Sequence, residues 1–339
     1  MKLFKQTILI LVIFLKTGNL LSDNNLFNVN NIILEKTENV SNNQLANKAI
    51  KKAFNQLLNK VLLEKDISKI SNLSFSNVKN LVMHYNISKN SEIERSELSF
   101  NVAFDKDKIH DLLYKNEISY SYITDKEFYI LPILIRKNNI YIFSNNYFYE
   151  NWDIINKNDL IEFILPAENI EIIQNVNQSR NNLLNLKLSS LFREHMNKNA
   201  AIVLIEKNED NKNKVFLKAK IQNKIISKSV NIKSNDKNEI AVMNKIIFEV
   251  KDNLINLVKS QNLIDIRTPS FLNVKLALNK NSNLVILNTR VRNIDLIENI
   301  FVQDFNKDYV NLKIKYLGKL EKIIFQLSKE KISLKLIND

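Results

Sequence analysis

Glycine and cysteine are so scarce in this chain that their scarcity limits what it can fold into and do. The 339 residues include 2 glycines, 3 prolines and no cysteine. Phosphate-cradling glycine loops, the glycine-flanked serine of many hydrolases, disulfides and thiolate metal sites all depend on these residues. Most familiar catalytic signatures are therefore excluded. The 45% of hydrophobic residues nevertheless give enough apolar mass for two or three ordinary cores.

The formal net charge is +13, from 49 lysines and arginines against 36 acidic residues. A charge of this size ordinarily indicates nucleic acid or an anionic membrane as a partner. Only 7 of the 49 bases are arginine, the side chain that best suits phosphates and base edges. The 55 asparagines are typical of an AT-rich genome, and the lysines are scattered among acids. We therefore expect no nucleic-acid partner.

The first 22 residues have the layout of a secretory signal peptide. Lys2 and Lys5 precede an apolar run from Thr7 to Leu15, and a short polar stretch follows. A run of nine residues is well short of the roughly 20 that a membrane-spanning helix needs. The sequence predicts a signal peptide over residues 1–22, export to the periplasm or envelope, and no stable transmembrane segment after processing.

Hydrophobic periodicity predicts an α+β protein with two mixed α+β units followed by a third module. The N-terminal domain, residues 23–124, is expected to contain strands at 26–36 and 92–104, helices beginning at Ser41 and after Asp105, and a further helix over residues 76–85. Along the second strand, Leu98, Phe100, Val102 and Phe104 should face one way. The central domain, residues 125–265, is expected to contain strands at 128–135, 139–143, 161–165, 200–205, 215–221 and 224–232, and helices at 149–157, 179–197 and 236–261.

The segments after Pro269 follow the order β-α-β-β-α-β, which is typical of a ferredoxin-like module. This C-terminal domain, residues 268–339, has expected strands at 271–278, 297–305, 309–316 and 331–336 and expected helices at 282–291 and 319–327. One sheet face is predicted to hold Val274, Leu276, Leu278, Leu312 and Ile314. A helical stripe should cover that face: Leu320, Ile323, Ile324 and Leu327.

Several weak features in a fixed order resemble an uncharacterised proteobacterial envelope family, domain of unknown function 2066. They are an alanine-leucine helix (Ala49, Ala53, Leu57, Leu58, Val61), a Val82-x-x-Tyr85 step into a strand, the strand end Val102-Ala103-Phe104-Asp105 before Leu112-Leu113, the strand end Leu165-Pro166, and the strand Ala200-Ala201-Ile202-Val203-Leu204. The closing two-helix module completes the likeness. The resemblance implies an exported protein without an agreed activity, and it supplies no site residues.

Three histidines, His84, His110 and His195, fall on separate predicted elements without metal-ligand spacing. The densest group of candidate ligands is Asp105, Asp107, His110 and Asp111. We interpret Asp105 and Asp107 as helix-capping carboxylates instead. Arg193, Glu194 and His195 can support acid-base chemistry only if the fold brings a partner group to them.

A run of aromatic residues offers the only candidate partner-binding site. Tyr141 and Phe143 alternate on a strand and are expected in the core, but four further rings follow within a few residues: Tyr147, Phe148, Tyr149 and Trp152. These four cannot all point inward from one short segment, so an exposed patch for a partner or a glycan is the hypothesis for them. Core packing is the alternative that the pattern favours.

These observations predict an exported, periplasmic binding or accessory protein with a role in envelope assembly or maintenance. Its expected partner is an envelope protein or a cell-wall component, and we expect no enzymatic activity, no catalytic residues, no metal and no cofactor. Two alternatives stay open. One is a hydrolase that uses paired carboxylates on an envelope substrate. The other is a lysine-rich binder of anionic surfaces.

Overall fold

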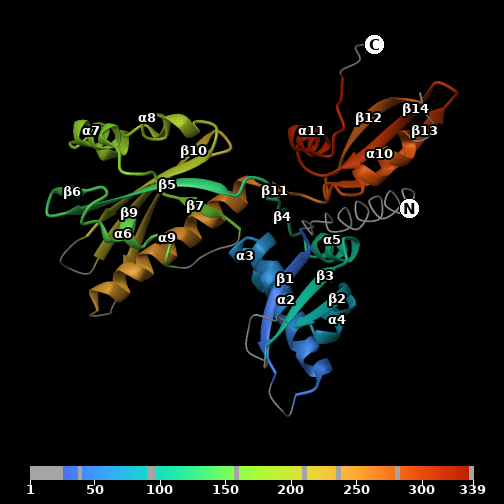
Figure 1. Cartoon of the computed structure of the whole chain (residues 1–339), viewed down its shortest axis with the longest axis horizontal. Helices are drawn as coiled ribbons and strands as arrows, with labels where there is room; N and C mark the ends of the chain where they lie inside the picture. The colour runs from blue at the N-terminus through green and yellow to red at the C-terminus, as the bar shows by residue number, and fades with distance from the viewer. Residues whose placement is uncertain are drawn as a thin grey trace, which may run out of the picture. The chain divides into compact units, whose positions relative to one another are not determined.

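A computed structural model describes residues 26–36, 40–89, 97–155, 160–207, 212–233, 238–278 and 283–335. The α+β class is confirmed, and the chain divides into two compact units (Figure 1). Unit 1 combines the residues up to Tyr120 with those from Ile264 onward, and unit 2 is Ser121–Leu263. The predicted signal peptide, residues 1–22, lies outside the described residues. None of the helices in the described ranges combines the length and apolar character that a membrane crossing needs.

The N-terminal part of unit 1 is a three-stranded antiparallel sheet in the order β1-β3-β2, packed against a long helix. Its elements are β1 Asn28–Glu35, α2 Asn42–Val61, α3 Glu64–Ile70, α4 Phe75–Asn80, β2 Val82–Lys89, β3 Glu97–Phe104 and α5 Lys106–Lys115. Ser41 forms a complete capping box with Gln44, as its position before the apolar stripe predicts. The predicted inward side chains of β3, Leu98 to Phe104, are buried against α2.

The helix predicted from residue 76 to residue 85 is wrong in its second half. Helix α4 ends at Asn80, and Val82 already belongs to β2, which pairs with β3 from Val82↔Phe104 to Lys89↔Leu98. Val82, Tyr85 and Ile87 are β-branched or aromatic, and a neighbouring strand with an open edge is available to them. Tertiary pairing therefore decides the conformation of this segment.

The C-terminal part of unit 1 contains β12 Ser270–Ala277, α10 Asn283–Val291, β13 Ile297–Phe305, β14 Tyr309–Tyr316 and α11 Leu320–Lys329. The strands form an antiparallel sheet in the order β12-β14-β13. Val274 lies opposite Leu312, as predicted for the shared face, and Ile323 and Leu327 are buried. Leu320 and Ile324 are 40% and 42% exposed, so the predicted helix stripe is narrower than expected. Residues 331–335 form no strand, and Leu336 lies outside the described residues, so the four-stranded ferredoxin-like sheet is not confirmed.

Polar contacts join the two parts of unit 1. The backbone N–H of Leu26 donates to Asp295 Oδ2 at 3.1 Å, and Lys106 Nζ donates to the carbonyl of Ile297 at 2.9 Å. Burial raises the pKa of Asp295 and lowers that of Lys106. Residues predicted as the first and third domains thus share one unit, and a partly buried charged side chain of each part contacts the backbone of the other.

Unit 2 is built on a six-stranded mixed sheet in the order β10-β9-β8-β5-β6, with β7 also paired to β5. Its strands are β5 Glu127–Arg136, β6 Asn139–Tyr141, β7 Glu162–Ile164, β8 Asn199–Glu206, β9 Lys212–Ile221 and β10 Lys224–Lys233. Strands β7 and β8 run parallel to β5, and the other pairs are antiparallel. At the edges of the unit, β4 Tyr120–Ser121 and β11 Leu263–Ile264 pair as a short two-stranded sheet.

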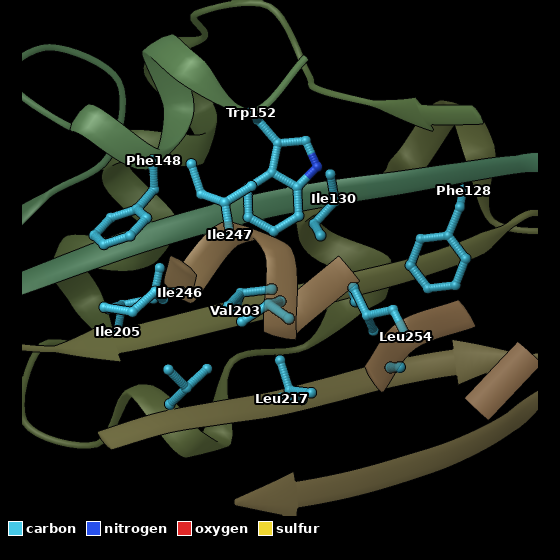
Figure 2. Close-up of a cluster of buried hydrophobic side chains, with 14 of the residues drawn as sticks. Phe128, Ile130, Phe148, Trp152, Val203, Ile205, Leu217, Ile246, Ile247 and Leu254 are labelled. Carbon is cyan, nitrogen blue, oxygen red and sulfur yellow. The ribbon is translucent and has the colours of Figure 1, made fainter. Parts of the chain in front are cut away.

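Helices cover both faces of this sheet, which explains why β8 is an uninterrupted apolar run (Figure 1). Ala201, Val203 and Ile205 belong to one core together with side chains of α6 Tyr147–Asn151 and α9 Glu239–Gln261. Figure 2 shows Val203 and Ile205 within this core. The alternating residues of β8, Ala200, Ile202 and Leu204, point to the second core. That core packs against α7 Ile170–Gln178, α8 Leu188–Leu191 and the 3₁₀ turns η1 Leu183–Asn185 and η2 Arg193–His195.

The continuous helix predicted at residues 179–197 is wrong, and α7 was not predicted at all. The segment after Gln178 consists of η1, α8 and η2, separated by non-helical residues. Its buried side chains are Leu186, Leu188, Leu191 and Phe192, a spacing that does not fit one helical face. Asn181, Asn182 and Asn185 stand at the start of this segment, and asparagine is a poor helix former.

Candidate functional site

A cleft of about 510 Å³ lies in unit 2, on the sheet face that carries α7 and α8. One wall is the segment that follows β7 and leads into α7, and the other is the end of α8 with η2. Apolar side chains line its interior: Ile164, Leu165, Pro166, Ile172 and Phe192. A concave site with apolar lining and a few polar groups at its rim is the usual form of a ligand pocket.

Two rings stack inside the cleft. Tyr129, near the start of β5, lies parallel to His195 of η2, with ring centroids 3.9 Å apart and an interplanar angle of 16°. The ring of Phe192 tilts against the same tyrosine at 6.4 Å. His195 therefore contacts an aromatic ring. A ring face does not supply the partner group that acid-base chemistry at Arg193, Glu194 and His195 requires.

Charged side chains stand at the rim. Arg193 forms an ion pair with Glu171, and Glu168 and Glu194 also line the cleft. Asn169 accepts a hydrogen bond from the backbone N–H of Glu171 at 2.7 Å and so begins α7 at this edge. The Tyr149 hydroxyl donates to the carbonyl of Pro166 at 2.8 Å. Burial raises the pKa of Tyr149, and the negative charges of Glu168 and Asp153 raise it further.

The aromatic segment proposed as a binding patch is part of the core instead. Phe148 and Trp152 are 1% and 0% exposed, and both point toward α9 and the sheet (Figure 2). Tyr147 is partly buried, and its hydroxyl donates to Asn244 Oδ1 at 2.6 Å. Tyr149 supports the wall of the cleft through Pro166. The exposed four-ring patch is therefore wrong, and the core alternative is right.

The buried side chain of Asn146 explains how these rings turn inward. Its amide nitrogen donates to the carbonyls of Pro132, Tyr141 and Ile142 at 2.9, 3.2 and 2.8 Å, and its amide oxygen accepts from the Phe148 N–H at 3.2 Å. Pro132 lies between the stretches of β5 that pair with β7 and β6. One asparagine thus supplies a hydrogen-bond donor to three carbonyl groups at this point of the sheet and also caps α6. The cap directs Phe148 into the core.

The histidine-aspartate group on α5 serves the fold. Asp105 Oδ1 accepts from the N–H groups of Asp107 and Lys108 at 3.0 and 3.3 Å, as expected of an N-cap. His110 is buried, with its ring stacked on Tyr120 and edge-on to Phe27, and its Nδ1 lies 3.8 Å from Glu298 Oε1. Within the described ranges, no three His, Cys, Asp or Glu side chains gather closely enough to hold a metal ion.

Falling pH should destabilise unit 1 through His110. Burial, with the neighbouring Lys106 charge, lowers the pKa of His110 to about 4, although Glu298, Asp107 and Asp111 oppose the shift. Because the folded pKa lies below the unfolded value, stability is expected to fall as the pH drops from about 6.5 to 4, by about 3 kcal/mol in total. Urea unfolding at several pH values should show that His110→Phe removes this dependence.

The buried Asp295 acts in the opposite direction, because its raised pKa favours the protonated folded state at low pH. The comparison of wild type with His110→Phe cancels that contribution, since both chains keep Asp295. His84→Gln, on the exposed surface of β2, is the control. Identical pH profiles for wild type and His110→Phe would contradict the assignment.

The sequence interpretation missed most of the cleft. It identified Arg193, Glu194 and His195, but it did not connect them with Tyr129, Glu168 or Glu171. The Asn169-Ile170-Glu171 step, which begins three residues after Pro166, is a helix-start signal, and it could have placed α7 and the acidic rim.

Comparisons with known proteins do not define the class of protein to which this chain belongs. No family model matches the chain, and no curated protein matches it. A solved structure described as "Crystal structure of uncharacterized protein" is similar at 11% identity, over 41% of this chain and 94% of that chain, with a TM-score of 0.18. That score carries no argument about fold or function. The resemblance to the domain of unknown function 2066 family stays a prediction.

Proposed function

We propose that the chain is an exported binding or accessory protein of the cell envelope, and that the cleft of unit 2 holds its ligand. The cleft itself carries the proposal: an open site of about 510 Å³ with apolar lining, a stacked pair of rings and charged groups at the rim. Its expected partner is an envelope protein or a cell-wall component. The signal-peptide pattern of residues 1–22 supports export to the periplasm or envelope.

Binding without catalysis fits the polar groups of the cleft better than the hydrolase alternative does. A carboxylate pair needs one acid to stay protonated and another to stay ionised near the reacting bond. Glu171 is instead ion-paired with Arg193, and the imidazole of His195 lies flat on Tyr129. The other two glutamates of the cleft, Glu168 and Glu194, are exposed at its rim and not buried beside a reacting bond. The ion-paired and stacked groups hold each other in place, as the walls of a recognition site do.

An anionic-surface role is the second candidate, and it is favoured by the outer face of the C-terminal sheet. Lys275 Nζ lies 3.9 Å from the ring centre of Tyr309, and Lys313 Nζ lies 4.5 Å from that of Phe271. Phe271 and Phe301 are 51% and 47% exposed.

The β12-β14-β13 order with its crossover helix also supports a ferredoxin-like arrangement for this module.

The test is capture of a partner from envelope extract with the full processed chain as bait. Protein recovered from the envelope fraction should begin near Asp23, and the bait should retain a defined component. Tyr129→Ala and Leu165→Ala remove half-buried groups of the cleft and should reduce that capture at least fivefold, because aromatic and apolar anchors dominate binding energy.

Tyr114→Ala is the matched control, since Tyr114 is 58% exposed in unit 1. Thermal unfolding of each variant separates lost binding from lost folding. Equal capture by the cleft variants would reject the cleft as the ligand site. A full-length chain found in the cytosol would reject export, and release of a cleaved component would favour the hydrolase alternative.

A further inference from the structure

The cleft is acidic in a basic protein. The chain carries a formal charge of +13, yet three glutamates line the cleft against one arginine: Glu168, Glu171 and Glu194 against Arg193. The ion pair of Arg193 with Glu171 leaves Glu168 and Glu194 as carboxylates without a cationic partner among the described residues. The local charge of the cleft is thus opposite in sign to the net charge of the chain.

Acidic side chains also lie on β5 and β7, the two strands that lead to the cleft. Glu127 of β5 lies directly beside Glu162 of β7 in the parallel register, and Tyr129 lies beside Ile164. Side chains two residues apart share a sheet face, so this acidic pair borders the side of the cleft that holds Tyr129. Lys198 Nζ lies 2.8 Å from Glu127 Oε2 and 3.6 Å from Asp125 Oδ1. Adjacent like charges are unfavourable, and Lys198 forms ion pairs with two of these acids, Glu127 and Asp125.

Apolar side chains form part of the cleft lining, beside its charged and polar groups. Leu165, Pro166 and Phe192 line it, and the exposed edge of the Tyr129–His195 stack adds aromatic surface. A methylene stem packs well on such a surface while its charged end stays at the rim. Aromatic faces also attract ammonium and guanidinium groups. Among the described residues, the cleft lacks the clustered ligands that a metal ion needs.

We propose that the cleft binds a cationic side chain on an aliphatic stem, a lysine or arginine of an extended peptide segment in a partner protein. Glu168 and Glu194 receive the charged end, and Leu165, Pro166 and Phe192 pack on the stem. The inference rests on the proposed function, because it takes the cleft to be the ligand site. It adds the chemistry of the ligand and the residues that select it.

Calorimetric titration of the full processed chain tests the proposal with three blocked tripeptides that differ at one position. The probes carry lysine, Nζ-acetyl-lysine or glutamate between two alanines. The lysine probe should bind, and both other probes should bind at least tenfold more weakly, because acetylation removes the charge and keeps the stem. Raising the ionic strength to about 0.15 M should weaken the lysine probe several-fold, since the carboxylates are exposed.

Two variants connect the effect to the carboxylates. Glu168→Gln combined with Glu194→Gln should weaken the lysine probe about tenfold, as the sum of two exposed charge interactions. Glu206→Gln, an exposed glutamate at the opposite end of β8, should leave the affinity unchanged. All three substituted glutamates are at exposed positions, so both variants should retain the fold.

The outcomes separate this inference from the proposed function. Equal binding of the lysine and acetyl-lysine probes, or no lysine binding at millimolar concentration, overturns the cationic ligand. If Tyr129→Ala still abolishes capture from envelope extract in that case, the cleft stays the ligand site with another chemistry. Spermidine binding without binding of the lysine probe also overturns the peptide source. Loss of both the lysine binding and the dependence on Tyr129 rejects the two proposals together.

Discussion

Trp152→Ala is expected to destabilise unit 2 by about 3 to 5 kcal/mol. The indole is 0% exposed, packs edge-on to Phe163 with centroids 6.1 Å apart, and lies 5.6 Å from Lys251 Nζ. Truncation would leave a large cavity between α6, β7 and α9, and it would also expose the carbonyl contacts of Lys251. Because the chain has a single tryptophan, circular dichroism rather than fluorescence must follow the denaturation of the variant.

Tyr149→Phe is the comparison for this substitution. It removes one hydroxyl that donates to the Pro166 carbonyl and keeps the ring, so about 1 kcal/mol should be lost. A surface aromatic patch predicts the reverse ranking, with Trp152→Ala nearly silent. A stability loss below about 0.5 kcal/mol for Trp152→Ala would therefore restore the patch hypothesis.

Leu312→Ala should destabilise unit 1 by about 2 to 5 kcal/mol. Leu312 is 0% exposed and lies on β14 between Val274 of β12 and Val302 of β13. It is thus a fully buried side chain on the middle strand of this sheet. Removal of its methyl groups leaves a cavity in a closely packed core, which the neighbouring side chains fill only in part. Urea denaturation of the full chain measures the loss.

Lys313→Ala tests the register of the same strand. Lys313 points to the opposite face, where its ammonium group lies over Phe271, and an exposed cation–π contact contributes about 0.5 to 1 kcal/mol. The two neighbouring substitutions should therefore differ by at least 1 kcal/mol. Equal losses would mean that the register of β14 is wrong, because a one-residue slip exchanges the two faces.

Elements whose stability comes from a repeating pattern could be predicted from the sequence. The capping box at Ser41, the alternating β3 and the apolar β8 each signal their conformation within a few residues. The segments that failed lack such a pattern. Val82 begins a strand because β3 offers a pairing edge, and residues 183–195 follow the shape of the sheet beneath them. Neither cause is local in sequence.

The candidate site could be predicted only in part for the same reason. Its residues come from the start of β5, from the segment after β7 and from η2, which the parallel β5–β7 pairing brings together. Sequence alone gives no measure of that proximity. The aromatic segment failed differently, since the inward turn of Phe148 depends on Asn146 and on a proline carbonyl 14 residues earlier.

The short pairing of β4 with β11 has a consequence for how the chain is made. Unit 1 is discontinuous, and the hydrogen bond from Leu26 to Asp295 joins residues 269 positions apart. A ribosome therefore releases all of unit 2 before the last part of unit 1 exists. Once unit 2 has folded, its paired ends bring Tyr120 and Ile264 together and shorten the effective loop that unit 1 must close. Folding of unit 2 should therefore lower the entropic cost of bringing the two parts of unit 1 together.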